Sequence, residues 1–531
     1  MPSLSATGKL SLLGGVTFAL GGLLGAVDAL TTAGTTVLAG LGFAWALTVP
    51  LPRRMRRERL EFSWWIVEGV RRADHPVTVR VALRNPTDRT LTLGAPRLSL
   101  SPGLRHARWK GSRVEIPAKK QGIFDLEVRP GHAGRHVLHG AWLTLGGPLG
   151  LTWAPLYFPN PLVLEVGPRS ATASFRRTTA RPQPSSKVGR STRREGEGAE
   201  IRELREHQPG DPFHRIAWKA TARRGRLMVR ETEDDAQTTR VIVLDAGPAM
   251  RGDLRGGSKL DYATELIAQA CKLSAIAGDP LGLIAFDTRI TAIVQPSSQP
   301  SHFQSLLSQS LEQRMLVDED LTDVDDEQLE ELIARYFREQ EGLIIRTGVG
   351  GRERLAQVAA EATRRDPLMR IPVRAKDETA RILRAFCRAR AIPLPLRYDS
   401  SGATRLRGLE AAMRAATENA REPRTVIVLS DLDPFDDGDA LRSAFSTGQG
   451  RGRRHRVTVV APMGGDFVPT SDKRDASTIR DALLQDERLR VEGLRHGLSK
   501  VGVPLYFADK RNPFAHWLAR ASAPRIAQKR R

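Results

Sequence analysis

Two long apolar runs open the chain. The first extends from Leu10 to Leu30 and the second from Val37 to Leu51, with a short polar step between them. A helix of roughly 20 residues crosses about 30 Å of hydrocarbon, and both runs reach that length if the second helix begins near Thr32. The pattern therefore predicts a two-helix membrane hairpin over residues 1–59, with Asp28 at its turn.

Arginines at positions 53, 54, 56, 57 and 59 follow the second run. Basic residues beside a span remain on the cytoplasmic side, so we expect a multi-pass protein of the cytoplasmic membrane whose soluble domains face the cytoplasm. A cleaved signal peptide with the sequence Val27-Asp28-Ala29 at its end is the alternative. The second run would then still stop transfer.

Short alternating segments follow, from Val67 to Glu165, and turn-forming pairs such as Asn-Pro, Pro-Gly and Gly-Gly separate them. Alternation with a period of two is typical of strands with one buried face. We expect an antiparallel β-sandwich domain of about seven strands over residues 60–168.

From residue 240 onward, continuous apolar segments alternate with segments of helical periodicity. The predicted strands are Arg240–Asp245, Leu281–Phe286, Ile290–Val294, Thr425–Asp431, Val457–Pro462 and Val503–Asp509. The helices predicted between them are Lys259–Ala277, His302–Gln313, Leu406–Glu418 and Arg488–Val501. Continuous apolar strands are buried on both faces, so the order predicts a doubly wound α/β sheet over residues 240–524, with Ile290–Val294 as an antiparallel edge.

A helical insertion of about residues 314–395 interrupts this sheet. Leu329, Ile333 and Phe337 recur there at helical spacing, and acidic side chains cluster before and between them. We expect an amphipathic acidic helix that packs on its own domain, with the basic segment Arg205–Arg230 as the candidate surface and a docking face for a partner as the alternative. The basic linker 169–194 and the basic tail 525–531 have too few apolar positions to join a core.

Charge narrows the class of partner. The chain has 82 Lys and Arg against 60 Asp and Glu, a net charge of +22, which favours nucleic acid, anionic lipid or an acidic protein surface as the binding partner.

Cys271 and Cys387 lie far apart and form no CxxC pair, which indicates a reducing compartment. No GxxxxGK[ST], HExxH or GxSxG motif occurs, so we predict no enzymatic activity.

Residues 195–239 combine arginines, carboxylates and one large aromatic residue around the turn Pro209-Gly210-Asp211. Arginine can hold a carboxylate by two parallel hydrogen bonds, so internal ion pairs can order such a segment. The simplest interpretation is a salt-bridged loop packed on a sheet edge, with the Trp218 side chain as its hydrophobic anchor.

The run LREHQPGDPFHRIAWKATARRGRLMVRETE resembles the signature of the bacterial domain-of-unknown-function family fifty-eight. The matching residues are Arg205, Pro209, Gly210, Asp211, Arg215, Ile216, Trp218, Lys219, Ala222, Arg223, Leu227, Val229 and Glu233. The run departs from the signature at His207, usually an aromatic, and at Pro212 and Ala217, usually acidic. The candidate residues for partner binding, or for shaping the segment, are Arg205, Pro209, Gly210, Asp211, Arg215, Trp218, Lys219, Arg223, Arg230 and Glu233.

The resemblance implies a bacterial inner-membrane protein whose von Willebrand factor type A-like domain works with MoxR-class AAA+ ATPases. In that fold the first strand delivers Asp-x-Ser-x-Ser, and two later loops deliver a Thr and an Asp, which together hold a divalent cation. The corresponding residues here are the segment Asp245-Ala246-Gly247-Pro248-Ala249, Thr404 and Asp431. Both serines are absent, and a hard cation such as Mg²⁺ needs several oxygen ligands, so we expect a degenerate site with at most weak Mg²⁺ binding.

Two functions remain. The first is a membrane-anchored, non-catalytic interaction module that recruits a MoxR-class AAA+ ATPase and client proteins. The second is a membrane protein that binds nucleic acid or anionic lipid, which the net charge and the tail 525–531 favour.

Overall fold

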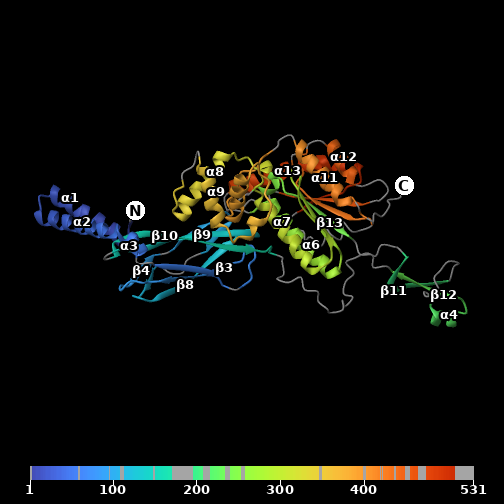
Figure 1. Ribbon diagram of the computed structural model, residues 1–531, viewed down its shortest axis with the longest axis horizontal. Coiled ribbons are helices and arrows are strands. Elements are labelled where there is room, and N and C mark those ends of the chain that lie inside the picture. Colours follow the sequence, from blue (N-terminus) through green and yellow to red (C-terminus); the bar gives the residue numbers. More distant parts are fainter. Residues whose placement is uncertain are drawn as a thin grey trace. The chain divides into compact units, whose positions relative to one another are not determined.

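The mixed α/β structure, a computed structural model, groups into two compact units (Figure 1). One unit comprises Met1–Arg169 with Met315–Arg397, and the other Ser170–Arg314 with Tyr398–Arg531. The residues described are 3–57, 60–67, 69–94, 96–107, 113–147, 150–169, 195–206, 216–233, 239–252, 257–345, 350–398, 402–418, 420, 422–433, 435, 438–448, 455–463 and 474–508. The predicted linker 169–194, beyond its first residue, and the predicted tail 525–531 lie outside them.

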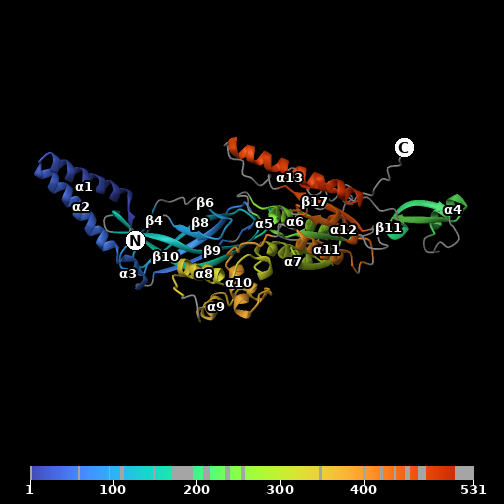
Figure 2. The same cartoon turned by 90° about the horizontal axis from the view of Figure 1, so that it is seen from above.

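The first unit begins with a helical hairpin of α1 (Ala6–Leu24) and α2 (Asp28–Thr48), and α3 (Leu51–Arg57) follows. Figure 2 shows α1 and α2 lying side by side. By length and composition, both are long and apolar enough to cross a membrane. The turn comprises residues 25–27, so Asp28 lies in the first turn of α2, where a negative charge is favourable near the helix N-terminus.

Small residues allow the two helices to approach closely. A Cβ atom on Gly22 would lie 2.4 Å from the backbone nitrogen of Thr31, and one on Gly34 would lie 2.3 Å from that of Ala19. Gly22 thus serves close helix packing, whereas a Cβ atom on Gly14 would meet nothing within 4 Å.

Two antiparallel sheets are formed by the strands that follow the helical hairpin, together with β1 before it. The strands are β1 (Ser3–Leu4), β2 (Glu61–Ile66), β3 (Val77–Arg84), β4 (Leu91–Gly94), β5 (Arg97–Leu100), β6 (Leu104–Ala107), β7 (Arg113–Ile116), β8 (Gln121–Pro130), β9 (Gly134–Gly146) and β10 (Thr152–Val166). One sheet has the order β2-β3-β8-β6, and the other β1-β10-β9-β4-β7 with β5 on β9. Val79 and Val81 of the first sheet share one core cluster with Leu138 and Leu164 of the second, so alternate side chains of both sheets are buried together.

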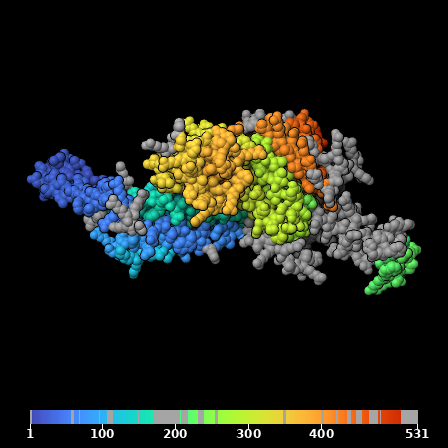
Figure 3. Space-filling model, viewed as in Figure 1, coloured from blue at the N-terminus to red at the C-terminus, as the bar shows by residue number. Residues whose placement is uncertain are grey.

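The helical insertion belongs to this first unit. It comprises α8 (Asp326–Tyr336), the π-helix η5 (Phe337–Glu341), α9 (Gly351–Ala362), α10 (Glu378–Ala389) and the short 3-10 helices η4 (Glu319–Leu321) and η6 (Pro367–Arg370). In Figure 3 the insertion (yellow to orange) lies over the strands of the first unit (teal and blue).

The insertion contacts β5, β9 and β10 through the polar side-chain atoms of Tyr336 and Gln340. Tyr336 packs edge-on against His139, with 3.1 Å between its hydroxyl and His139 Nδ1. Gln340 Oε1 accepts hydrogen bonds from Ser99 and Tyr157 at 2.6 and 2.8 Å. The expectation that the acidic helix packs on its own α/β domain is therefore wrong, because its amphipathic pattern requires a partner surface without specifying which one.

The second unit holds a six-stranded sheet of order β15-β14-β13-β16-β17-β18. The strands are β13 (Arg240–Asp245), β14 (Leu281–Phe286), β15 (Ile290–Ser297), β16 (Thr425–Leu429), β17 (Arg456–Pro462) and β18 (Leu505–Ala508). All neighbours are parallel except β14 and β15, which confirms the antiparallel edge.

Helices cover both faces of this sheet (Figures 1 and 2). They are α5 (Pro248–Arg251), α6 (Lys259–Ala277), α7 (Pro300–Glu312), the 3-10 helix η3 (Gln313–Met315), α11 (Ala403–Thr417), α12 (Gly438–Gly448) and α13 (Arg474–Lys500). Along β13, Ile242 and Leu244 pack with α6 and α7, whereas Val241 and Val243 pack with α11, α12 and α13. Each face of the strand is thus apolar, as the continuous apolar run predicts.

Candidate functional site

Polar side chains gather where three parallel strands of the six-stranded sheet end. Asp245 is the last residue of β13, Asp287 follows β14, and Ser430 and Asp431 follow β16. The chain adds β14 and β15 on one side of β13, and then β16, β17 and β18 on its other side. The topological switch point of the sheet therefore lies between β13 and β16. In open α/β sheets, ligands bind outside the carboxyl ends of the strands at this kind of position. We call these residues, with Arg251, Lys259, Arg405 and Glu487, the carboxyl-edge cluster.

Asp245 is fully buried and accepts hydrogen bonds from three sides. The backbone N–H of Gly247 donates to Oδ1 at 2.8 Å, and the Ser430 hydroxyl donates to Oδ2 at 2.6 Å. Nη2 of Arg405 lies 2.7 and 2.6 Å from the two carboxylate oxygens. Burial raises the pKa of Asp245, and Arg405 and Ser430 act against that rise by stabilising the charged form.

Arg405 reaches this carboxylate from the first turn of α11 and is 1% exposed. Its Nη1 donates to the backbone carbonyl of Asp433, and its guanidinium carbon lies 5.4 Å from the ring centre of Phe435. Burial opposes the charge of Arg405, but Asp245, Asp431 and Asp287 offset this and raise its pKa. The guanidinium therefore remains a cation that is held on several sides.

A second buried arginine serves the neighbouring carboxylate. Nη2 of Arg251, at the end of α5, donates to Asp287 Oδ2 at 2.6 Å, and both side chains are at most 3% exposed. Burial raises the pKa of Asp287 to about 6, with Arg251 opposing the rise and Asp245 adding to it. Nε of Arg405 lies 4.0 Å from Asp287 Oδ1, so the two ion pairs are adjacent.

The third cation is Lys259, the first residue of α6. Its Nζ lies 2.8 Å from Asp431 Oδ2 and 2.7 Å from Glu487 Oε1. The other oxygen of Asp431 accepts the backbone N–H of Asp433 at 3.1 Å. This turn places Leu432 in the left-handed region with φ 59°, which lets the loop after β16 fold back on itself.

These contacts test the expected cation site. The structure brings Asp245 and Asp431 together but leaves the side chain of Thr404, one residue before Arg405, exposed. The oxygens of both carboxylates already face protein cations or backbone N–H groups, so the donor set does not fit a divalent metal. Among the described residues, no group of three or more His, Cys, Asp or Glu side chains could hold a metal ion.

The described parts of residues 195–233 are β11 (Glu195–Glu206), α4 (Trp218–Arg224) and β12 (Met228–Glu233), and we call them the β11–β12 hairpin. Pro209, Gly210, Asp211 and Arg215 lie outside the described residues. The strands pair with each other in a separate two-stranded sheet, in which Arg205 faces Val229, Arg230 faces Leu204, and Glu233 is opposite Glu195 and Glu200 across a bulge.

The described side chains of the hairpin are largely exposed. Trp218 is 65% exposed and Leu227 46%, and Lys219 and Arg223 on α4 are exposed as well. Arg226 and Glu206 form an exposed ion pair of 2.8 Å. The interpretation of Trp218 as a side chain buried against a sheet edge is therefore wrong. The pairing of β11 with β12 satisfies the backbone hydrogen-bonding groups of these strands without burying the aromatic side chain.

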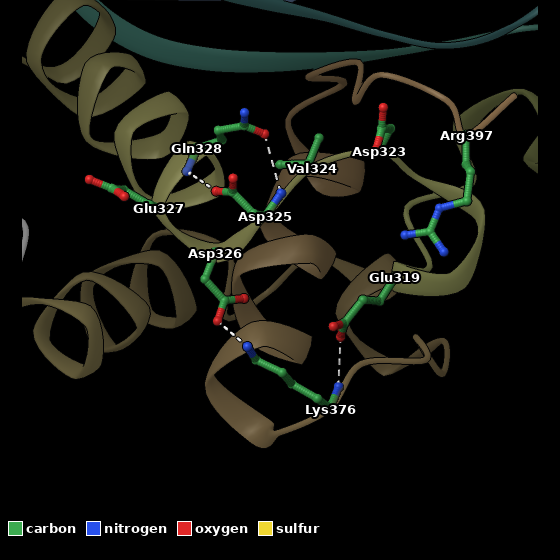
Figure 4. Close-up of a pocket in the computed structure, with 9 residues that line it drawn as sticks. All are labelled: Glu319, Asp323, Val324, Asp325, Asp326, Glu327, Gln328, Lys376 and Arg397. Atoms are coloured by element: carbon green, nitrogen blue, oxygen red, sulfur yellow. Dashed lines mark hydrogen bonds and ion pairs between the residues drawn. The ribbon is translucent and has the colours of Figure 1, made fainter.

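A hollow of about 600 Å³ lies at the start of α8 in the first unit (Figure 4). Three of the acidic side chains that line it, Glu319, Asp325 and Asp326, have local partners. Asp325 caps α8 by accepting the backbone N–H of Gln328 at 2.8 Å. Asp326 pairs with Lys376, and Glu319 accepts the backbone N–H of the same lysine at 2.8 Å. The acidic run thus starts a helix and joins two segments of the insertion.

Comparison with known proteins agrees with the signature. The family model described as "Protein of unknown function DUF58" matches residues 203–336. Over these residues the chain belongs to the DUF58 family. The DUF58 match includes the described part of the hairpin from residue 203, the first three strands of the six-stranded sheet, and α8.

The chain is also similar to "Uncharacterized protein YeaD" of Bacillus subtilis (strain 168), with 29% identity over 127 residues. That alignment covers 24% of this chain and 32% of the relative, so the chain spans about a third of the relative's length. Two solved structures are more distant. A mutant of the PilB minor pilin from Streptococcus sanguinis is 9% identical with a TM-score of 0.25, covering 89% of this chain and 88% of that one. The cupredoxin domain of amoB from Nitrosocaldus yellowstonii is 16% identical with a TM-score of 0.13, covering 21% and 65%.

Proposed function

We propose that this DUF58 protein is a membrane-anchored interaction module without a reaction centre of its own. In this proposal the α/β unit is von Willebrand factor type A-like, the soluble parts face the cytoplasm, and the partners are a MoxR-class AAA+ ATPase and its client proteins. The apolar helices α1 and α2 support the anchor. The buried ion pairs support a rigid, non-catalytic carboxyl edge, because their charged groups are committed to one another.

The exposure of Trp218 carries the interaction part of the proposal. The side chain of Trp218, on the basic helix α4, is 65% exposed and that of Leu227 is 46% exposed, which leaves a large apolar area in water. Tryptophan and arginine are the residues that most often dominate binding energy at protein interfaces. The positive charge of α4, from Lys219, Arg223 and Arg224, favours an acidic partner surface.

The test uses the full chain in detergent as bait for a purified MoxR-class ATPase. Trp218→Ala should weaken capture by roughly 30-fold or more, the loss typical of an interface tryptophan. Trp65→Ala is the matched control, because Trp65 on β2 is also exposed, at 42%, and should leave capture unchanged. Unchanged capture with Trp218→Ala would contradict the proposal.

The basic helix α4 also favours a second candidate function, binding to anionic lipid headgroups. Each basic residue near an anionic membrane contributes about 1 kcal/mol. Flotation of the solubilised chain with vesicles that contain or lack anionic lipid separates the two. If Lys219→Glu with Arg223→Glu abolishes binding to anionic vesicles while ATPase capture persists, lipid binding is the function of this hairpin.

A further inference from the structure

The carboxyl-edge cluster has a cation where a metal would bind. Arg405 places one guanidinium nitrogen within 2.7 Å of both oxygens of Asp245, the residue that ends the first parallel strand. The same guanidinium donates to the backbone of Asp433 and faces Phe435. It therefore neutralises a buried carboxylate at the position where a divalent cation would have to meet its first ligand.

Gly247 gives an independent observation. A Cβ atom at this position would lie 2.4, 2.5 and 2.7 Å from Nη2, Cζ and Nε of Arg405. These separations are too short for any side chain unless the guanidinium moves. Position 247 is the first serine position of the Asp-x-Ser-x-Ser pattern, so a hydroxyl ligand at that position and the guanidinium exclude each other.

We infer that the Arg405 guanidinium takes the place of a bound divalent cation, with Gly247 as the residue that makes room for it. The guanidinium keeps its positive charge and fills the position of the metal ion. Any contact that a partner makes at this edge is therefore independent of metal ions. Asp431, the other expected carboxylate ligand, is engaged in the same way by Lys259. This inference rests on the carboxyl-edge cluster alone and goes beyond the interaction proposed for Trp218.

Removing the guanidinium while restoring the hydroxyl should reopen the site. In Gly247→Ser with Arg405→Ser, the oxygens of Asp245 and Ser430 and the hydroxyl introduced at position 247 border the emptied volume, and the short side chain at position 405 leaves it open to water. Mn²⁺ and Mg²⁺ prefer such all-oxygen sites. Binding is measured on the solubilised full chain by Mn²⁺ electron paramagnetic resonance and by calorimetry with Mg²⁺.

The native chain should take up no Mn²⁺ that depends on Asp245, and the double variant should bind one equivalent that Asp245→Asn removes. The unfolding midpoint of the double variant should also rise with Mg²⁺, whereas the native midpoint should not. Mn²⁺ uptake by the native chain that Asp245→Asn abolishes would overturn the inference. A folded double variant that binds no Mn²⁺ would overturn it as well.

A double-mutant cycle keeps the inference testable if the serine variant does not fold. Arg405→Lys retains a positive charge but removes the planar group that a Cβ atom at position 247 would meet. Gly247→Ala should lower the unfolding midpoint of the native chain by more than it lowers that of the Arg405→Lys chain. Equal losses in both backgrounds would show that Gly247 does not make room for the guanidinium.

Discussion

At the scale of single residues, Lys259 shows how the carboxyl-edge cluster is held. Its ammonium group lies between Asp431 and Glu487, at 2.8 and 2.7 Å. Burial disfavours the charge of Lys259, but the two carboxylates more than offset it and raise its pKa. Burial also opposes the charge of Asp431, yet Lys259 and Arg405 hold the pKa of that carboxyl below its usual range. The charges of Lys259 and Asp431 are thus stabilised by their neighbours.

Lys259→Met should therefore be strongly destabilising. Removing one partner of a buried ion pair leaves an uncompensated charge and typically costs about 3–5 kcal/mol in the free energy of unfolding. Chemical denaturation of the solubilised chain measures the loss. Arg226→Met is the control, because the pair of Arg226 with Glu206 is exposed and contributes little. Equal stability of the two variants would contradict the role given to Lys259.

The sequence identifies the carboxylates of this cluster better than its cations. Asp245 and Asp431 each follow a continuous apolar segment, and Asp287 does so too, although the sequence prediction did not include it. Arg405 and Lys259 have no such signal, because arginine and lysine at a helix start normally lie in water. Only the three-dimensional contacts show that these two are buried.

At the scale of elements, strands and helices with strong periodicity are predicted closely. β13, β14 and α6 begin and end at the residues predicted for them, since buried strands and a capped amphipathic helix have clear sequence limits. α12 (Gly438–Gly448) has no counterpart in the prediction. The location of α8 is also missed, because its apolar face is evident in the sequence but the surface of β9 that receives it is not.

The contact between α8 and β9 should make stability depend on pH. Burial lowers the pKa of His139 from 6.5 to about 4, and the charge of Arg390 adds to this effect. The unfolded chain takes up a proton near pH 6.5 and the folded chain only near pH 4, so stability falls as the pH decreases through this window. The expected loss is about 3 kcal/mol by linkage.

His139→Gln removes the titrating group, so the unfolding free energy of this variant should decrease less between pH 6.5 and 4 than that of the native chain. His496→Gln, at an exposed position on α13, is the control and should keep the native pH profile. If His139→Gln keeps the native profile as well, His139 does not stay neutral in the folded contact.

At the scale of the whole molecule, the base of the helical hairpin is joined to the β-sheet of the same unit. β1 pairs with β10 just before α1 begins, and Thr48 at the end of α2 lies 2.6 Å from Thr152, oxygen to oxygen. A Cβ atom on Gly147 would lie 2.3 Å from both threonine hydroxyls, so this junction has no room for a side chain. A membrane that contains the hairpin therefore has the antiparallel sheets directly at the surface where the hairpin opens.

The arginines of α3 (Leu51–Arg57) lie at this open end, and basic residues remain on the cytoplasmic side of a span. The turn of the hairpin should consequently reach the opposite surface. Ala29→Cys, near the turn, should react with a membrane-impermeant maleimide on intact spheroplasts, whereas Lys120→Cys, exposed on the sheet unit, should react only after permeabilisation. The native thiols, Cys271 and Cys387, are both buried and contribute little background. Labelling of Lys120→Cys on sealed spheroplasts would show that the sheets lie outside the cytoplasm. It would thereby exclude any partner that resides in the cytoplasm.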